Sequence, residues 1–215
     1  MTRGPRRSVQ PDAVLDAALE LIDEGSLTMR ALATRVGLTP GALYTYFPDR
    51  SAIVAALADR LLAEADLSLL DDPSQSPHQR IENYSLALRE VLLAHPAAVP
   101  AILGAAFNGP VALHVGESLL GVLPDARATY TVMVYVLGSI ALEAADLEAF
   151  GTPPPPEPDR IAARRAVFVI DPEQFPRTYG EIDAIAAYNS TGQFRWGLHR
   201  VLAGLSGSQQ SGCQH

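Results

Sequence analysis

Residues 28–53, TMRALATRVGLTPGALYTYFPDRSAI, are the most informative segment of the chain. It reads as two short helices joined by a tight turn. Thr28 is a favourable N-cap for the first helix, and Gly37 offers the left-handed backbone on which helices commonly end. Thr39 and Pro40 then pair an N-cap with a proline at the first helical position. This arrangement predicts a helix-turn-helix, with its second helix over residues 39–47.

Two further helices are expected on either side of this pair. Upstream, apolar residues recur at helical spacing over 14–22, and Gly25 ends the segment. Downstream, Asp49 is a candidate N-cap for a helix that we expect to run to about Leu69. Apolar side chains of the short helices are predicted to pack against the first helix; they are Leu32, Val36, Leu38, Leu43 and Phe47.

The second short helix has the chemistry of a helix that enters a DNA major groove. Its first turn, Thr39 to Ala42, carries only small side chains, so its backbone can approach base edges and a methyl group can touch thymine. Arg30, in the preceding helix, has the two-pronged donor set that reads guanine. Hydroxyl groups and a guanidinium suited to phosphates follow in the chain, at Tyr44, Thr45, Tyr46 and Arg50.

Residues 28–53 resemble the DNA-binding domain of the tetracycline-repressor (TetR) family, and the preceding AVLDAALELI, residues 13–22, resembles its first helix. The resemblance covers about residues 11–60. It implies base contacts by Arg30, Pro40, Gly41 and Ala42, and phosphate contacts by Thr28, Tyr44, Tyr46 and Arg50. One recognition helix reads half a site, so the expected partner is a palindromic double-stranded DNA operator bound by a homodimer.

Charge is distributed unevenly along the chain. The 215 residues carry a formal net charge of −8. Residues 1–50 hold six arginines and six acidic residues, whereas residues 51–215 hold ten arginines and eighteen acidic residues. A strongly acidic protein would disfavour a polyanionic partner, but that argument applies here only to the C-terminal part. Three N-terminal arginines form a basic arm suited to the DNA backbone: Arg3, Arg6 and Arg7.

The rest of the chain also predicts helices. Helical periodicity is expected over 81–94, 126–150 and 192–205, with two short helices in the charge-free segment 91–116. The proline-rich stretch 151–158 is not expected to be helical. Between these, 159–190 is ambiguous, and Val167 to Ile170 suits a strand by composition alone. The prediction is an all-α chain with a DNA-binding domain at 1–50, a connecting helix at 51–70, a ligand-binding and dimerisation domain at 71–205, and a flexible tail at 206–215.

Residues 194–205, FRWGLHRVLAGL, resemble the last helix of the tetracycline-repressor-type regulatory domain. The resemblance implies that this helix and the helix at 126–150 form a four-helix bundle across a dimer axis, where Gly197 and Gly204 would allow close packing. The predicted interface residues are Tyr130, Val134, Leu137, Ala141, Phe194, Leu198, Val201 and Leu205.

The resemblance further implies a pocket for a small-molecule effector in each regulatory domain. The charge-free segment 91–116 is a candidate wall for an apolar pocket. Its predicted ligand contacts are Leu103, Phe107, Asn108 and His114. An ordinary core role for Leu103 and Phe107 is the alternative.

The sequence lacks the motifs that are typical of several enzyme classes. The sequence has no nucleophile elbow, zincin motif, phosphate-binding loop or dinucleotide fingerprint, so we expect no catalytic residues, no metal and no cofactor. A single cysteine, Cys213, excludes an intramolecular disulfide. Segment 91–116 is long enough to span a bilayer, but three prolines interrupt it, so it is expected to be buried in protein. Without a signal peptide, the expected location is the cytoplasm.

These patterns favour a ligand-responsive transcriptional repressor that a small, largely apolar molecule releases from its operator. Two alternatives remain open at this point. One is a helical enzyme. The other is a dimeric small-molecule-binding or adaptor protein with weak or no specific DNA binding. The first turn of the recognition helix is only weakly polar, which is consistent with this alternative.

Overall fold

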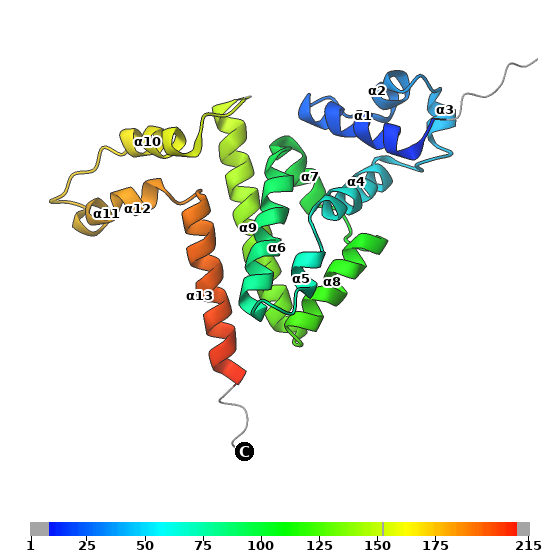
Figure 1. The fold of residues 1–215 in the computed structure, drawn as a ribbon. Helices are drawn as coiled ribbons and strands as arrows, with labels where there is room; N and C mark the ends of the chain where they lie inside the picture. The colour runs from blue at the N-terminus through cyan, green and yellow to red at the C-terminus, as the bar shows by residue number, and fades with distance from the viewer. Residues whose placement is uncertain (1–8, 152, 210–215) are drawn as a thin grey trace, which may run out of the picture.

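The computed structural model describes residues 9–151 and 153–209, and this part of the chain contains helices and no strand. The all-α prediction is therefore confirmed. The N-terminal unit comprises α1 (Pro11–Asp23), α2 (Met29–Arg35) and α3 (Pro40–Leu43), and α4 (Arg50–Glu64) leads from it into the rest of the molecule (Figure 1). The predicted basic arm, Arg3, Arg6 and Arg7, lies outside the described residues.

Two glycines end the first two helices in the same way. Gly25 and Gly37 have positive φ values of 66° and 69°. After each of them the next amide reaches back to the last turn, with Ser26 N donating to Leu21 O at 2.8 Å and Leu38 N donating to Ala33 O at 2.8 Å. This is the Schellman closure, which satisfies carbonyls that a helix end leaves open.

The connecting helix is shorter than expected. It begins at Arg50, where the Asp49 carboxylate accepts from Ala52 N at 2.8 Å, as predicted. It ends at Glu64 rather than near Leu69, and α5 (Ser68–Asp71) follows as a separate turn of helix. The Asp66 carboxylate accepts from Ser68 N at 3.0 Å and Ser68 Oγ at 2.7 Å. This local turn competes with the helix for backbone groups and so interrupts it.

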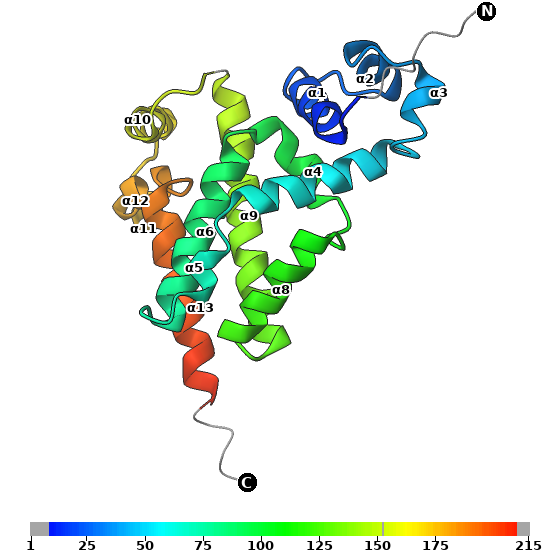
Figure 2. The same ribbon diagram turned by 45° about the vertical axis from the view of Figure 1, so that its right-hand side comes forward.

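The body is a bundle in which long helices enclose an apolar core (Figures 1 and 2). Its elements are α6 (Pro77–Leu93), the 3-10 turn η1 (Pro96–Ala98), α7 (Val99–Leu103), α8 (Pro110–Val122), α9 (Ala126–Phe150) and α13 (Thr191–Gln209). The charge-free segment therefore forms two helices, as predicted, after the 3-10 turn. Its prolines stand at helix starts, where the missing N–H costs nothing. The side chains at the centre are Leu88, Leu92, Ile102, Val115, Leu119, Val136, Ile140, Phe194 and Leu198.

The ambiguous segment 159–190 folds as helices that project from the body on the side away from α1–α3 (Figures 1 and 2). They are α10 (Glu157–Val167), α11 (Pro176–Gly180) and α12 (Ile182–Ala186). The strand suggested for 167–170 is wrong: Val169 is 95% exposed, and no neighbouring chain segment pairs with it as a strand. Composition alone cannot supply the partner that a strand requires. Helix α10 also begins two residues inside the stretch expected to be non-helical.

Helix α9 is long and apolar enough to cross a membrane by length and composition, and α6 with η1 and α7 pass the same test only as a pair bent by 96°. Only 28% of that apolar window of α9 is buried, but the helix packs against α6, η1, α7 and α13. It carries two nearly buried carboxylates, Glu143 and Asp146, that are ion-paired with arginines of α6 and α10. At the C-terminus, α13 continues to Gln209, past the predicted tail boundary at 206, and residues 210–215, including Cys213, lie outside the described residues.

Candidate nucleic-acid interface and regulatory domain

The two short helices are both capped by threonines that the sequence indicated. Thr28 Oγ1 accepts from Ala31 N at 3.0 Å, and Thr39 Oγ1 accepts from Ala42 N at 3.2 Å. These caps fix the start of α2 and α3 without help from distant residues. The hydroxyl hydrogen of each threonine remains able to donate outward.

Helix α3 is shorter than the predicted span 39–47. Its regular part is Pro40–Leu43, and the chain then tightens, with Thr45 N donating to Ala42 O at 3.1 Å and Tyr46 N donating to Leu43 O at 2.9 Å. These i→i+3 bonds are typical of a last 3-10 turn. Thr45 Oγ1 also donates to Ala42 O at 2.7 Å. The hydrogen of that hydroxyl is therefore engaged within the turn, although its oxygen can still accept a hydrogen bond.

The first turn of α3 is presented outward because one side chain anchors the helix. Leu43 is 0% exposed in the core shared with α1 and α2. Thr39, Pro40 and Gly41 are exposed, and open space surrounds Gly41. Of the two predicted tyrosines, Tyr44 is 51% exposed and Tyr46 is half-buried. The small residues thus form the projecting surface of the unit.

The arginines of this unit divide into paired and unpaired ones. Arg35 bonds Glu20 at 2.9 Å and Glu24 at 2.7 Å, which ties α2 to α1 and lowers the pKa of the Glu24 carboxyl, chiefly through that hydrogen bond. Arg30 and Arg50 are exposed and make no ion pair within the described part of the chain. Among the described arginines near α3, the two that no carboxylate neutralises are both predicted DNA contacts.

The predicted ligand residues are not brought together in one cavity. Leu103 packs partly buried against the core, and Phe107 is 38% exposed. Asn108 lines a cavity of about 550 Å³ between the start of α4 and the α7–α8 segment. His114 is exposed, with Nδ1 2.8 Å from Pro110 O. Their role as ligand contacts stays a prediction.

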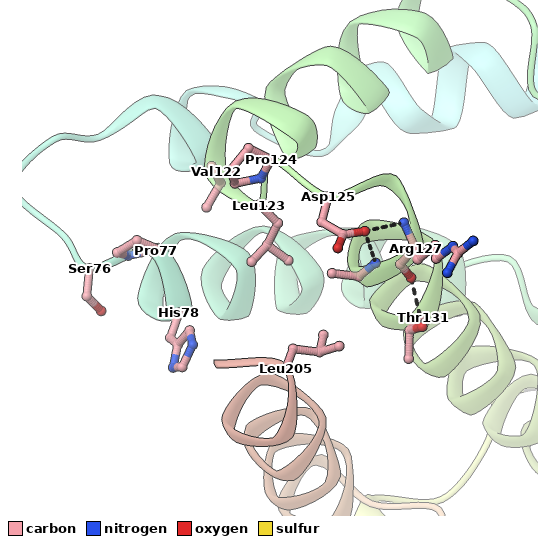
Figure 3. A pocket seen from close by; sticks show the side chains of 11 residues that line it. Ser76, Pro77, His78, Val122, Leu123, Pro124, Asp125, Arg127, Thr131 and Leu205 are labelled. Carbon is pink, nitrogen blue, oxygen red and sulfur yellow. Dashed lines mark hydrogen bonds between the residues drawn. The ribbon is translucent and has the colours of Figure 1, made fainter. Parts of the chain in front are cut away.

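A cavity of about 590 Å³ (Figure 3) lies at the end of the body away from α1–α3 (Figure 1). Its walls come from the start of α6, the α8–α9 turn and the end of α13, and they include His78, Leu123, Asp125, Thr131 and Leu205. Asp125 caps α9 there by accepting from Arg127 N at 2.7 Å. Sequence reasoning missed this cavity because its residues come from three distant segments, and no local motif links them.

One buried hydroxyl in α6 has no hydrogen-bond partner. Tyr84 is 1% exposed, and its oxygen contacts no donor or acceptor within the described residues. Burial raises the pKa of this phenol. An unpaired hydroxyl in an apolar core costs about 1–3 kcal/mol. It is therefore a ready donor for any acceptor that enters the core beside α6.

The predicted dimer residues differ in their exposure. Tyr130 and Val134 are 71% and 52% exposed on α9, and four others are half-buried: Leu137, Ala141, Val201 and Leu205. Phe194 and Leu198 correct the prediction, because at 3% and 0% exposure they pack inside the protomer. The periodic apolar stripe of α13 marks its core-facing side.

Gly197 also differs from expectation. The ring of Tyr135, on α9, occupies the space that a Cβ would need, with Cζ 2.6 Å from that position. Tyr135 Oη donates to Phe194 O at 3.0 Å. The close packing at Gly197 is therefore within one chain, whereas Gly204 faces open space. Two exposed apolar side chains were not among the predicted interface residues: Leu142 at 63% and Trp196 at 57% exposure. Neither belongs to the periodic apolar positions from which the interface was predicted.

A cluster of buried charges holds α10 against α6, α9 and α12. Glu143 is bonded by Arg89 at 2.7 Å and by Arg160 at 3.5 Å. Arg164 pairs with Asp146 and donates through Nε to Ala186 O at 2.7 Å. All of these side chains are between 4% and 13% exposed. In residues 9–151 and 153–209, no group of three or more histidine, cysteine or acidic side chains could hold a metal ion.

Comparisons with known proteins cover both parts of the chain. Residues 14–57 match the family model described as bacterial regulatory proteins, tetR family, and residues 71–208 match that of the tetracyclin repressor-like C-terminal domain. The class A tetracycline repressor protein from transposon 1721 of Escherichia coli is 25% identical over 92% of this chain and 91% of its own.

Solved structures agree with these matches. A possible TetR family transcriptional regulator from Streptomyces coelicolor A3(2) is 26% identical, with a TM-score of 0.76 over 93% of this chain and 100% of its own. BioQ, solved with its double-stranded DNA operator, is 28% identical, with a TM-score of 0.56 over 67% of this chain and 93% of its own. The chain is thus a DNA-binding transcriptional regulator, and it belongs to the tetracycline-repressor family of bacterial regulatory proteins.

Proposed function

We propose that this regulator acts as a homodimeric repressor in the cytoplasm, without catalytic activity. It binds a palindromic operator through residues 1–50 and leaves that operator when a small, largely apolar molecule binds residues 71–205. Residues 51–70 connect the two functions. The proposal keeps all ten predicted DNA contacts: Thr28, Arg30, Thr39, Pro40, Gly41, Ala42, Tyr44, Thr45, Tyr46 and Arg50.

The observation that carries the proposal is the exposed first turn of α3 beside two unpaired arginines. Leu43 anchors the helix from below, so its small residues project into solvent without a bulky side chain between the backbone and a base pair. Arg30 and Arg50 lie on the helices before and after α3. Unneutralised guanidiniums at both flanks supply the phosphate and guanine contacts that such a helix needs.

A dimer is supported by the unpartnered faces of α9 and α13. Tyr130, Val134 and Leu142 leave apolar surface exposed on α9, and Trp196 does so on the neighbouring α13. Gly138, between Val134 and Leu142, has nothing within 4 Å of a Cβ position, so a second chain can approach closely there. Two copies joined on these faces would present two recognition helices to one duplex.

The proposed effector chemistry follows from the body. The hydrophobic cluster at its centre encloses the Tyr84 hydroxyl, which has no hydrogen-bond partner within the described residues. A largely apolar molecule with one hydrogen-bond acceptor would satisfy that hydroxyl while it buried its own apolar surface. Native mass spectrometry of the purified dimer, before and after denaturation, tests whether such a molecule co-purifies.

Fluorescence anisotropy with duplexes from the intergenic regions beside the gene tests the DNA contacts. Arg30→Ala should cost about 1–3 kcal/mol of specific binding. Arg177→Ala is the matched control, because Arg177 is an exposed arginine on α11, far from α3. Equal affinities for Arg30→Ala, Arg177→Ala and wild type would favour the adaptor alternative, and so would the absence of specific binding by wild type at moderate salt.

A further inference from the structure

The N-terminus of α8 is capped by a residue of α4. Gly109 holds the N-cap position and has no side chain to offer. The Asp59 carboxylate takes that role instead, accepting from Ala112 N at 2.8 Å and from Val111 N at 3.3 Å. A carboxylate at this place satisfies two open amides and interacts favourably with the positive end of the helix dipole.

Glycine at position 109 is explained by this contact. Its φ of −71° is ordinary for any residue, so backbone conformation does not require glycine. A Cβ there would overlap with Cγ and Oδ1 of Asp59 and lie 2.9 Å from Oδ2. The absence of a side chain at Gly109 is what lets the Asp59 carboxylate reach the amides of α8.

The Asp59 carboxylate has no competing partner. No cation pairs with it within the described part of the chain, and it accepts hydrogen bonds from the amides of Val111 and Ala112 in α8. The next residue, Arg60, forms an ion pair with Asp16 of α1, with Nη2 2.6 Å from Oδ1. Adjacent residues of α4 therefore hold α8 on one side and the DNA-binding unit on the other.

The contact lies between the predicted effector residues and the predicted DNA contacts. Helix α4 starts at Arg50, directly after the recognition turn, and reaches Asp59 in its third turn. Phe107 and Asn108 lie in the segment just before Gly109, the N-cap of α8, and His114 lies in the first turns of α8. A displacement of this segment must either carry α4 along or break both hydrogen bonds to Asp59.

We propose that Asp59 is the positioning residue that couples α8 to α4 and so transmits effector binding to the DNA-reading helices. This inference rests on the proposed function. It requires that the link be specific, since an effector shifts DNA affinity only through interactions that differ between two states. Two hydrogen bonds that exist only while α8 and α4 keep their relative position meet that requirement.

Four variants of the full-length chain separate capping from coupling. Asp59→Ala removes the carboxylate, and Gly109→Ala displaces it without changing Asp59. Gly116→Ala is the matched control, because it adds a methyl group to the same helix where nothing lies within 4 Å. The double variant Asp59→Ala with Gly109→Asp restores a carboxylate cap from within the α8 segment, where the vacated space admits it, but it lacks the hydrogen bonds between α4 and α8.

Hydrogen exchange of the segment 110–116 without DNA tests the contact itself. A lost N-cap is expected to speed exchange about 5-fold in Asp59→Ala and in Gly109→Ala. Gly116→Ala should not speed it, and the double variant should restore protection. Unchanged exchange in both single variants would overturn the proposal.

The same measurement with a bound duplex tests the coupling, because linkage requires DNA to affect α8 if α8 affects DNA binding. In wild type, a duplex identified by anisotropy should change the exchange of 110–116. The double variant should bind that duplex yet lose this response. A full response in the double variant, or none in wild type, would overturn the proposal. A wild-type chain that binds no duplex would instead overturn the proposed function and the regulatory role with it, while the DNA-free exchange would still decide whether the cap exists.

Discussion

The N-terminal unit and the α9–α10 region use the same residue type in opposite ways. The chain's sixteen basic residues are all arginine. Near α3, Arg30 and Arg50 are exposed and unpaired within the described residues. Beside α9, Arg160 and Arg164 are nearly buried and paired with carboxylates. An exposed, unpaired guanidinium is available to a polyanion, whereas a buried pair positions helices.

The largest expected effect comes from breaking the buried cluster. Glu143→Ala leaves Arg89 and Arg160 without their shared carboxylate and should lower the free energy of unfolding by about 3–5 kcal/mol. Asp183→Ala, which removes the exposed partner of Arg165, should cost less than about 1 kcal/mol. Urea unfolding at one fixed protein concentration measures both. Equal losses would contradict the contrast, and Glu143→Gln provides a milder variant if Glu143→Ala does not fold.

A second effect sharpens the distinction between packing within the chain and packing between chains. Gly197→Ala displaces the ring of Tyr135, a residue of α9, from its position against α13. The substitution should destabilise the protein by about 1–3 kcal/mol. Gly204→Ala meets open space and should be neutral or stabilise the helix by up to about 1 kcal/mol. Thermal unfolding compares the two. A Gly197→Ala protein as stable as Gly204→Ala would show that the packing of Tyr135 against Gly197 does not contribute to the free energy of unfolding.

The proposed phosphate contact of the unpaired Arg50 can be tested by varying the salt concentration. Arg50→Ala should weaken binding to all duplexes alike and reduce the slope of log affinity against log salt by about 1, because one phosphate contact is lost. Stability should change little, since Arg50 is exposed and unpaired within the described residues. Anisotropy titrations over a range of salt concentrations measure the slope. An unchanged slope would remove Arg50 from the phosphate contacts.

The smallest effect concerns the exposed Arg35–Glu24 pair. Arg35 lowers the pKa of Glu24 from its ordinary value of 4.5. The pair therefore contributes stability above that value, and the contribution is lost as the pH falls through the lowered pKa. Wild type should exceed Glu24→Gln slightly in unfolding free energy at pH 7, and the difference should vanish at low pH and shrink in high salt. A difference independent of pH would contradict this origin.

Local signals explain why the N-terminal unit was predicted well. Thr28, Thr39 and Asp49 cap their helices from three residues away, and Gly25 and Gly37 close the turns within a single helix end. Such interactions depend on neighbours in the sequence, so the pattern suffices to find them. The main local error was the end of α4, where Asp66 forms a turn that competes with an otherwise helical pattern.

Periodicity was less informative in the regulatory part. The apolar stripe through Phe194 and Leu198 locates the side of α13 that faces its own core, because burial inside the protomer takes the most apolar face. The surface left for a partner carries Trp196 beside arginine and histidine. Hydrophobic spacing alone cannot distinguish the two sides, so half of the predicted α13 contacts proved to be internal.

The helical class and the helix-turn-helix can be derived from the amino-acid sequence alone, since both depend on groups within a few positions of one another. Which arginines lack a carboxylate partner, where the cavities lie and how Asp59 links α4 to α8 follow only from the packing of the helices. The amide of Ala112 meets Asp59 across 53 positions, and Arg89 meets Glu143 across 54. Contacts at that separation arise from the packing of whole helices, and no short pattern encodes them.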